Sequence, residues 1–356
     1  MENKLSFCTL FDSNYLSRGL ALYNSLMEHC ENFHLYIFPF DEKCLEVLTE
    51  LNLPNTTLIP LSEFEDGELL KVKQGRNRAE YAWTCTSSSI LFTIEKFNLQ
   101  SCTYLDADLF FFDSPQILID ELGSDSVLIT EHRYTPIYDQ TKKSGIYCVQ
   151  FITIRNDEHG LKTLRWWRNA CLEWCYARVE DGKFGDQKYL DNWTKQFEKI
   201  HVLNHLGGGV APWNVQQYNF KKDNNLIFGI EKKSGKSFPL IFFHFHHLRF
   251  YGNDWIQLTG PFLIVKQVVK LIYRPYIIHL EQIKKQLELQ FPNYDPHGRF
   301  TNYKHSHVNS KNLDQVIKIY IMKIAFAMNK FFNKSRIFSF INPLNLYNVN
   351  FFNESK

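Results

Sequence analysis

The sequence lacks the patterns that mark a membrane span, a secretion signal or a structural zinc site. No apolar run reaches the ~18 uninterrupted residues of a spanning helix, and the first residues lack the apolar core of a signal peptide. None of the eight cysteines forms a Cys-x-x-Cys pair, which argues against a structural zinc. From these absences we expect reduced cysteines and a cytoplasmic location.

The chain also lacks a strong charge of either sign, internal repeats and low-complexity tracts. Its formal net charge is +2, whereas a general nucleic-acid binder needs a concentrated basic surface, so we expect no nucleic-acid partner. A length of 356 residues with 44% apolar residues is enough for a large globular core in one or two domains.

Short apolar segments alternate with helical patterns in the first part of the chain. The expected strands are 5–10, 33–38 and 58–60, and the expected helices are 16–26 and 41–51. This alternation is typical of an α/β fold with a mostly parallel sheet and helices on both faces. Ligands of such sheets bind at the carboxyl ends of the strands. Thr9 and Asp12, at the end of the first strand, are therefore candidates for contact with a nucleotide base or ribose.

Two carboxylates follow the short apolar segment 102–105. In an extended chain residues i and i+2 lie on the same face, so Asp106 and Asp108 can converge on one hard cation. A divalent ion held by one or two carboxylates keeps positions open for diphosphate oxygens. An acidic turn is the alternative, but two charges with apolar residues on both sides need compensation. We therefore predict a metal site here.

A basic cluster lies in the polar stretch 62–80, ahead of a helix expected over 79–96. Its members are Lys71, Lys73, Arg76 and Arg78. Arg78, near the helix start, is the favoured ligand for a diphosphate, because the guanidinium group can donate two parallel hydrogen bonds to phosphate. A solvated basic face is the open alternative.

Asp186 and Gln187 lie between a glycine turn and a helical pattern, and they are the candidate catalytic pair. A carboxylate beside an amide suits sugar hydroxyls, each of which needs a donor and an acceptor. An aspartate at this place can also serve only as a helix cap. Downstream, three glycines at 207–209 allow the backbone to approach a ligand closely. Gly208 and the aromatic wall of Trp213 thus belong to an expected binding loop.

A histidine follows the buried-strand pattern 239–243. His244 is expected to emerge at the end of that strand, where an imidazole can join Asp106 and Asp108 as a ligand of Mn²⁺. A packed or hydrogen-bonded histidine is the alternative. The position favours His244 over His246 as the ligand.

Together these segments resemble the GT-A glycosyltransferases, in particular the bacterial and glycogenin-like transferases of family 8. The resemblance rests on the pair Asp106 and Asp108, on the pair Asp186 and Gln187, and on a later histidine-glycine loop. It covers residues 5–250. In that family an Asp-x-Asp pair and a later histidine hold Mn²⁺, and the metal binds the diphosphate of a nucleotide sugar.

The later loop matches the family motif His-x-x-Gly-x-x-Lys-Pro-Trp in part. The matching residues are His205, Gly208, Pro212 and Trp213. Ala211 replaces the lysine that usually touches phosphate. Because the motif of the family tends to follow a strand, the metal-ligating histidine can correspond to either His205 or His244.

The resemblance implies a hexosyl- or N-acetylhexosaminyltransferase that uses Mn²⁺ or Mg²⁺. It implies transfer from a nucleoside-diphosphate sugar, with a UDP-sugar favoured, to a hydroxyl of an acceptor, with retention of configuration. Asp186 acting as a general base is the inverting alternative. A glycan or lipid-linked acceptor from surface polysaccharide or lipopolysaccharide synthesis is expected on a different ground, the basic amphipathic stretch near the C-terminus that is described below.

Two other functions stay open. A sugar-phosphate nucleotidyltransferase would share the sheet and the metal, but it needs a glycine-rich basic loop after the first strand, and none is present. A non-catalytic carbohydrate-binding protein would use the aromatic residues as stacking platforms and would need no metal.

The character of the sequence changes after residue 260, so we expect a catalytic domain of residues 1–260 and a helical extension of residues 261–356. Within the extension, 313–340 alternates apolar residues with lysine and arginine, and Asp314 is its only acid. This composition predicts a basic amphipathic helix on an anionic membrane surface, at the inner face. Packing of the helix on the catalytic domain is the alternative.

Overall fold

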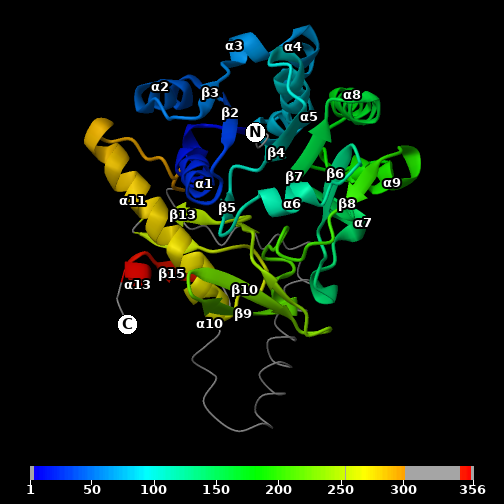
Figure 1. The fold of residues 1–356 in the computed structure, drawn as a ribbon. Helices are drawn as coiled ribbons and strands as arrows, with labels where there is room; N and C mark the ends of the chain where they lie inside the picture. Colours follow the sequence, from blue (N-terminus) through cyan, green and yellow to red (C-terminus); the bar gives the residue numbers. More distant parts are fainter. Residues whose placement is uncertain (1–3, 253, 301–344, 354–356) are drawn as a thin grey trace.

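The structure is a computed structural model that describes residues 4–252, 254–300 and 345–353 (Figure 1). At its centre is a seven-stranded sheet in the order β3-β2-β1-β4-β7-β6-β8. The strands are β1 (Leu5–Phe11), β2 (Phe33–Pro39), β3 (Thr56–Leu58), β4 (Ser101–Leu105), β6 (Val127–Glu131), β7 (Tyr147–Arg155) and β8 (Ile200–Val202). Neighbouring strands are parallel, except that β7 is antiparallel to β4 and β6. The predicted mostly parallel sheet is confirmed.

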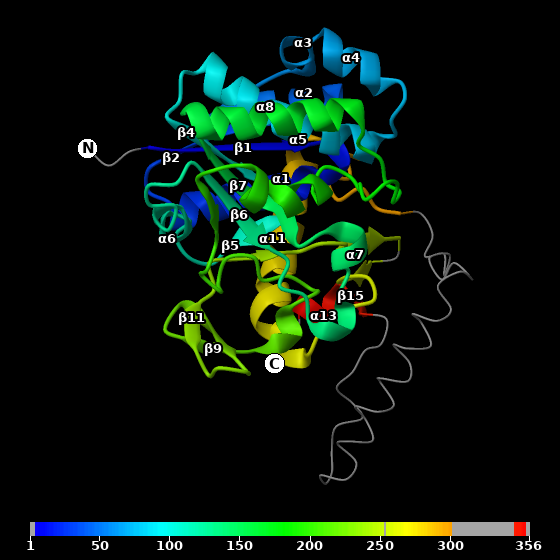
Figure 2. The same cartoon turned by 90° about the vertical axis from the view of Figure 1, so that its right-hand side faces the viewer.

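Helices cover both faces of this sheet, as predicted. The helices α1 (Leu16–His29) and α2 (Glu42–Leu51) share one core cluster, and α5 (Arg78–Lys96) and α8 (Glu158–Glu173) share the other. Figure 2 shows the sheet between α8 and α1. Alternate residues of β1 divide between the two layers, with Phe7 in the first cluster and Cys8 in the second. Because both faces are buried, the strands are apolar almost throughout.

Side-chain caps begin three of the main helices. Asp41 accepts the Cys44 N–H at 2.8 Å ahead of α2, and Asp157 accepts the Gly160 N–H at 2.8 Å ahead of α8. A reciprocal capping box between Asn77 and the N3 glutamate begins α5. These polar side chains satisfy N–H groups that the first helical turn leaves without intrahelical partners.

The polar stretch 62–80 is more regular than expected, since it contains α3 (Leu61–Phe64) and α4 (Gly67–Lys73). Asp66 accepts the backbone N–H of the second and third residues of α4 and so caps it. Leu69 is buried in the core cluster of α5 and α8. A single buried leucine anchors this helix, which is why its polar composition did not predict it.

Smaller sheets lie beside the carboxyl edge of the main sheet. Their strands are β5 (Leu109–Phe111) with β12 (Phe242–His244); β9 (Tyr218–Asp223), β10 (Leu226–Glu231) and β11 (Ser237–Pro239); and β13 (Arg249–Tyr251), β14 (Trp255–Gln257) and β15 (Leu346–Asn348). The short helices are α6 (Gln116–Asp120), α7 (Thr141–Ser144), α9 (Trp193–Gln196), α10 (Lys266–Val268) and α13 (Asn350–Asn353). Most of the strands in the stretch before Trp255 are thus short and antiparallel to their partners.

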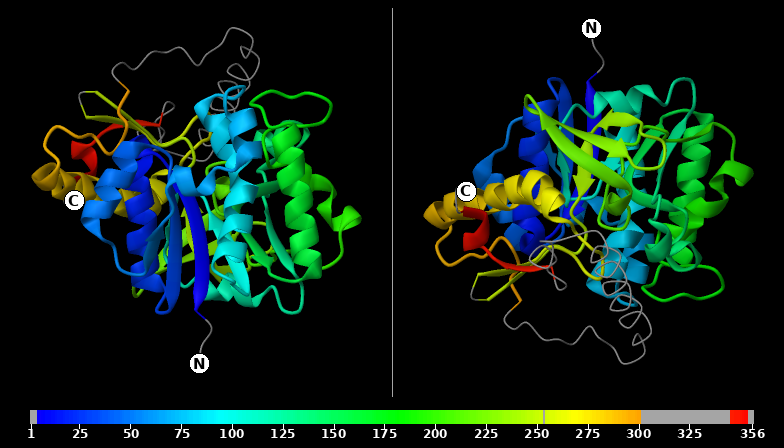
Figure 3. Two further views of the ribbon diagram at one scale, coloured as in Figure 1. Left: turned by 90° about the horizontal axis from the view of Figure 1, so that it is seen from above. Right: turned by 90° about the horizontal axis from the view of Figure 1, so that it is seen from below.

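The helix α11 (Arg274–Gln290) joins the C-terminal part of the chain to the rest of the core. It lies alongside α1 (Figure 3), and Tyr276 stacks on Phe245 with ring centroids 3.7 Å apart. The basic stretch 313–340 lies outside the described residues, so its membrane contact and the boundary at residue 260 stay predictions. Within the described ranges, no helix has the length and apolar character needed to cross a bilayer.

Close packing of α1 on β1 makes Gly19 a sensitive position. A methyl group on Gly19 would lie 2.4 Å from ring atoms of Phe11, whose side chain is buried. We expect Gly19→Ala to lower the free energy of unfolding by ~1–3 kcal/mol and the melting temperature by several degrees. The control is Gly67→Ala in α4, where a methyl group meets open space, and it should change stability by less than about 1 kcal/mol. Equal melting temperatures for the two variants would contradict this packing.

Candidate active site

The strand order of the main sheet reverses between β1 and β4. β2 and β3 lie on one side of β1, whereas β4 and the later strands lie on the other. In open α/β sheets, ligands bind outside the carboxyl ends of the strands at such a reversal. Asp12 directly follows β1, and Asp106 directly follows β4. The fold thus brings two of the predicted regions to one edge of the sheet.

The acidic pair lies in a tight turn between β4 and β5. The Leu109 N–H donates to the Asp106 carbonyl oxygen at 3.1 Å, and the Asp106 N–H donates to the Gln150 carbonyl oxygen at 3.0 Å. The two carboxylates are therefore not presented on one continuous strand, as the i, i+2 argument assumed. Asp108 is only 7% exposed, so its carboxylate faces the protein interior at the rim of the sheet.

His244 meets this turn because β12 pairs with β5. The register places His244 opposite Leu109, and the Phe245 N–H donates to the Asp108 carbonyl oxygen at 2.9 Å. As a result, His244 Nε2 lies 3.0 Å from Asp108 Oδ1 and 3.7 Å from Asp106 Oδ2. His244 is 4% exposed. The predicted histidine and carboxylates thus form one group, in which His244 and Asp108 are buried and the Asp106 side chain is 30% exposed.

Two neighbours fix the orientation of the His244 ring. Its Nδ1 lies 2.7 Å from Gln150 Oε1, so the Nδ1–H donates to the amide oxygen and Nε2 is directed at the carboxylates. The Trp213 indole packs edge-on against the ring, with centroids 5.4 Å apart. Trp213 is in turn held by a 2.9 Å hydrogen bond from its Nε1 to the His132 carbonyl oxygen. Trp213 was predicted as the aromatic wall of a binding loop, whereas no pattern in the sequence pointed to Gln150.

The charges of this group partly compensate one another. Burial raises the pKa of Asp106 to about 6. Burial opposes the charged form of His244, but Asp108 and Asp106 outweigh it and raise the His244 pKa well above its usual range. The imidazolium thereby supplies the compensation that the buried carboxylates require. The same two carboxylates and a neutral imidazole are donors that Mn²⁺ accepts, so the residues fit a divalent metal.

A second imidazole lies beside this group. Among the described residues, ligand atoms of Asp108, His244 and His246 all lie within 4.8 Å of one another. Burial lowers the pKa of His246 well below its usual value, which keeps this ring neutral, the form in which histidine binds metals.

The structure places His205 elsewhere. Its backbone N–H donates to Glu121 Oε2 at 3.0 Å, and its Nδ1 accepts the Gly207 N–H at 3.1 Å. The loop that His205 begins contributes instead through its backbone, since the Val210 carbonyl oxygen accepts the His244 N–H at 2.9 Å. Gly208 is packed too closely for a side chain, because a methyl group there would meet Leu203 and Leu118. Of the two histidines left open by the sequence, we therefore propose His244 as the metal ligand.

Asp186 is buried, with 6% exposure, and is close enough to Asp106 to feel its charge. Burial, and then the Asp106 carboxylate, raises the pKa of Asp186 to about 7. The Asp186 carbonyl oxygen accepts the Trp167 Nε1–H at 2.9 Å, which fixes the segment to α8. Gln187 Nε2 donates to the Ser144 carbonyl oxygen at 2.8 Å. The amide of Gln187 therefore holds the loop between β6 and β7.

Arg78 lies at the carboxyl ends of β1 and β2, where it bridges two carboxylates. Its Nε is 2.6 Å from Asp12 Oδ2, and its Nη2 is 2.5 Å from Asp41 Oδ2. Asp12 also accepts the N–H groups of the next helical turn. Thr9 is fully buried within β1, and its hydroxyl has no hydrogen-bond partner in the part of the chain that the structure describes. Arg78 thus positions Asp12, and its side chain remains 53% exposed.

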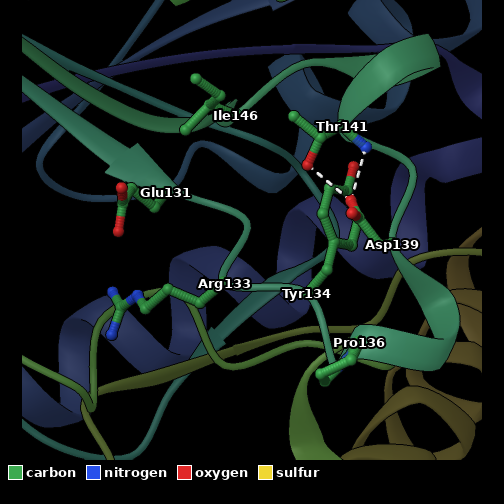
Figure 4. Close-up of a pocket in the computed structure, with 7 residues that line it drawn as sticks. All are labelled: Glu131, Arg133, Tyr134, Pro136, Asp139, Thr141 and Ile146. Atoms are coloured by element: carbon green, nitrogen blue, oxygen red, sulfur yellow. Dashed lines mark hydrogen bonds between the residues drawn. The ribbon is translucent and has the colours of Figure 1, made fainter.

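The end of β6 and the loop that follows it, residues 131–146, line a pocket of about 340 Å³ (Figure 4). It is lined by Glu131, Arg133, Tyr134, Pro136, Asp139, Thr141 and Ile146. Asp139 accepts hydrogen bonds from the Thr141 N–H and hydroxyl. Tyr134 stacks on His132, which packs edge-on against Trp213. The pocket therefore adjoins the wall that supports His244, and sequence reasoning did not identify it.

The molecule is thus an α/β protein with a mostly parallel sheet and an Asp-x-Asp turn and a histidine at the sheet's carboxyl edge. This is the arrangement that the resemblance to GT-A glycosyltransferases predicts. No protein-family model matches the chain. Two proteins of Bacillus subtilis (strain 168) are similar in sequence over 81% of this chain. YfnD is 29% identical, and the match covers 92% of its length. YfnF is 28% identical, and the match covers 97% of its length. Both are uncharacterized.

The solved structures that are similar to this chain include several glycosyltransferases. The galactosyltransferase LgtC with donor and acceptor sugar analogues is 13% identical, with a TM-score of 0.44 over 67% of this chain and 86% of that chain. GlyE of Streptococcus pneumoniae TIGR4 is 17% identical, with a TM-score of 0.38 over 58% of this chain and 48% of that chain. Mouse xyloside xylosyltransferase 1 is 12% identical, with a TM-score of 0.41 over 59% of this chain and 86% of that chain.

Proposed function

We propose that this chain is a metal-dependent glycosyltransferase. It transfers a sugar from a nucleoside-diphosphate sugar, with a UDP-sugar favoured, to a hydroxyl of a glycan or glycolipid acceptor. The observation that carries the proposal is the contact of the buried His244 ring with the buried Asp108 and the partly exposed Asp106 at the carboxyl edge of the sheet. A binding protein for neutral glycans has no need of buried carboxylates that a charged imidazole must compensate.

Asp106, Asp108 and His244 would hold a divalent cation, Mn²⁺ or Mg²⁺. Such a cation supplies electrostatic stabilisation of the charge that develops on a leaving diphosphate. Gln150 keeps the proton of His244 on Nδ1 and its Nε2 directed at the carboxylates. Trp213 closes the site behind the ring. The site is therefore organised in advance, which is the main requirement for electrostatic catalysis.

The nucleotide would bind at the ends of β1 and β2. Asp12, whose Oδ2 lies 2.6 Å from Arg78 Nε, can accept hydrogen bonds from ribose hydroxyls. Thr9 and Arg78 are the other proposed nucleotide-binding residues at this edge of the sheet. Gly208 and Trp213 would border the ligand from the opposite loop. Ribose hydroxyls commonly bind to such a carboxylate at the carboxyl edge of an α/β sheet.

The transferred sugar would lie between the metal group and Asp186. Asp186 and Gln187 can accept and donate hydrogen bonds to its hydroxyls. The pocket around Glu131 and Tyr134 adjoins the same site and is suited to the acceptor, since Gln187 binds the loop that forms it. We propose retention of configuration, and an acceptor from surface polysaccharide or lipopolysaccharide synthesis at the cytoplasmic face of the membrane.

A donor panel tests this proposal. Purified full-length chain is incubated with UDP-, GDP- and CMP-sugars and candidate acceptors, with Mn²⁺, Mg²⁺ or a chelator, and nucleotide release and product are measured. We expect transfer from one nucleotide class that the chelator abolishes, and the proton NMR spectrum of the product should show the anomeric configuration of the donor. Inverted product would assign Asp186 as a general base. Breakdown of the donor to a nucleoside triphosphate and a sugar 1-phosphate, seen only when pyrophosphate is added, would indicate a nucleotidyltransferase. Glycan binding without donor turnover would indicate a binding protein.

A further inference from the structure

His246 is held in the site by its local backbone. The Leu248 N–H donates to the Phe245 carbonyl oxygen at 3.1 Å, so the chain turns directly after β12. His247 occupies the left-handed region with φ 62°. The His246 carbonyl oxygen also accepts the Thr259 hydroxyl at 3.2 Å. This turn directs the His246 ring back toward the sheet edge.

The His246 ring shares a wall with His244. Trp213 packs edge-on against both imidazoles, with centroids 5.4 Å from each, and the two imidazole centroids are 5.3 Å apart. A ligand atom of Asp108 completes the group, with all three atoms within 4.8 Å of one another. Three ligand atoms this close can all bind one metal ion at roughly 2.0–2.3 Å after small shifts of the side chains.

A second imidazole changes which cation the site prefers. Mg²⁺ prefers oxygen donors and gives up its waters reluctantly. Mn²⁺, Fe²⁺, Co²⁺ and Zn²⁺ accept imidazole nitrogen, and their affinity for nitrogen-containing sites exceeds that of the hard cations. Asp108, His244 and His246, with Asp106 at 3.7 Å from His244 Nε2, offer two nitrogens and two carboxylates.

We propose that His246 is a protein ligand of the metal, beyond the two aspartates and one histidine, and that it makes the site selective for transition cations over Mg²⁺. The inference rests on the metal site of the proposed function. It concerns the ion alone and does not depend on which sugar is transferred.

Metal binding to the full chain tests this inference. Chelator-treated wild type, His246→Asn and the control His247→Asn are titrated with Mn²⁺, Co²⁺ and Mg²⁺ by calorimetry, without nucleotide or sugar. Asparagine tolerates the left-handed backbone of the control. We expect His246→Asn to lower Mn²⁺ and Co²⁺ affinity by about 10–100-fold and to change Mg²⁺ affinity little. His247→Asn should bind all three ions as wild type does.

Unchanged Mn²⁺ and Co²⁺ affinity in His246→Asn would overturn the inference, as would an equal loss for Mg²⁺. Electron spin-echo spectroscopy of Mn²⁺ bound to wild type counts the nitrogen atoms coordinated to the ion, and this test does not depend on how a variant folds. Two coordinated imidazole nitrogens are expected, and a single one would refute the role of His246. A chain that binds Mn²⁺ through two imidazoles but transfers no sugar would instead refute the proposed function alone.

Discussion

Replacing Asp108 with Asn is expected to lower kcat/KM for sugar transfer by at least ~10³-fold, which corresponds to about 4 kcal/mol of transition-state stabilisation. Asn keeps the size of the side chain but removes the charge that faces His244 Nε2 at 3.0 Å. A neutral amide is a much weaker partner for a divalent cation than a carboxylate. The loss should therefore appear in both metal binding and turnover, measured by calorimetry and by nucleotide release.

The matched control is Asp113→Asn, a few residues further along the same segment. Asp113 Oδ1 accepts the Ser114 N–H at 2.7 Å and does not belong to the buried metal group. This variant should keep metal binding and turnover within about 3-fold of wild type, as is usual for surface changes away from a site. Metal-dependent turnover of Asp108→Asn within about 10-fold of wild type would contradict the role assigned to this carboxylate.

Replacing Asp186 with Asn is expected to change how stability depends on pH. The folded chain holds the Asp186 pKa at about 7, well above the ordinary value of 3.8. A carboxyl group with a raised pKa stabilises the fold in full below its ordinary pKa, and this contribution is lost as the pH rises toward 7. The loss for wild type is at most ~4 kcal/mol, because each unit of pKa shift is worth about 1.4 kcal/mol.

Denaturant unfolding between pH 4 and pH 8, in the presence of a chelator, measures this contribution. Wild type should lose stability over this range through Asp186, whereas Asp186→Asn lacks that component and should be the more stable protein at pH 8. Asp181→Asn, in the exposed turn just before, is the control and should follow the wild-type profile. Parallel pH profiles for Asp186→Asn and wild type would contradict the buried, charge-coupled position of Asp186.

Activity should respond to the same substitution. Asp186 is 6% exposed and its charge is coupled to Asp106, so the amide alters both the sugar contacts and the field at the metal group. We expect a fall in kcat of about 10²–10³-fold, the usual cost of removing one electrostatic contact at a reacting centre, with Mn²⁺ affinity changed much less. A parallel loss of Mn²⁺ affinity would assign Asp186 to the metal group instead.

The main sheet and the acidic pair are predictable because their signals are local. Apolar strands end in polar residues, and the caps of α2 and α8 come directly before apolar helical patterns. Asp106 and Asp108 stand out because charges between apolar segments are costly without a partner. The turn that carries them was not predicted, since an extended strand and a tight turn both suit a short segment of this composition.

The choice between His205 and His244 could not be made from the sequence. Both histidines follow apolar segments, and only the long-range pairing of β12 with β5 decides which of them meets Asp108. Strand pairing across such a distance along the chain is set by tertiary packing, which local patterns do not encode.

Gln150 had no signal in the sequence argument, and His246 was ranked below His244, for different reasons. Gln150 is a polar residue inside an apolar strand and is completely buried, which in retrospect marks a structural or functional hydrogen bond. His246 was set aside in favour of His244, because nothing in the sequence shows that the chain turns after β12 and returns the second ring to the same site.

The measurement that tests the central claim most directly is a crystal structure with Mn²⁺ and a nucleoside diphosphate, recorded at the manganese absorption edge. The account predicts one strong anomalous peak at roughly 2.0–2.3 Å from an Asp108 oxygen and from His244 Nε2, with diphosphate oxygens on its open side. A peak at another group, such as Glu121 with His201, or a bound nucleotide with no metal at Asp108, would contradict it.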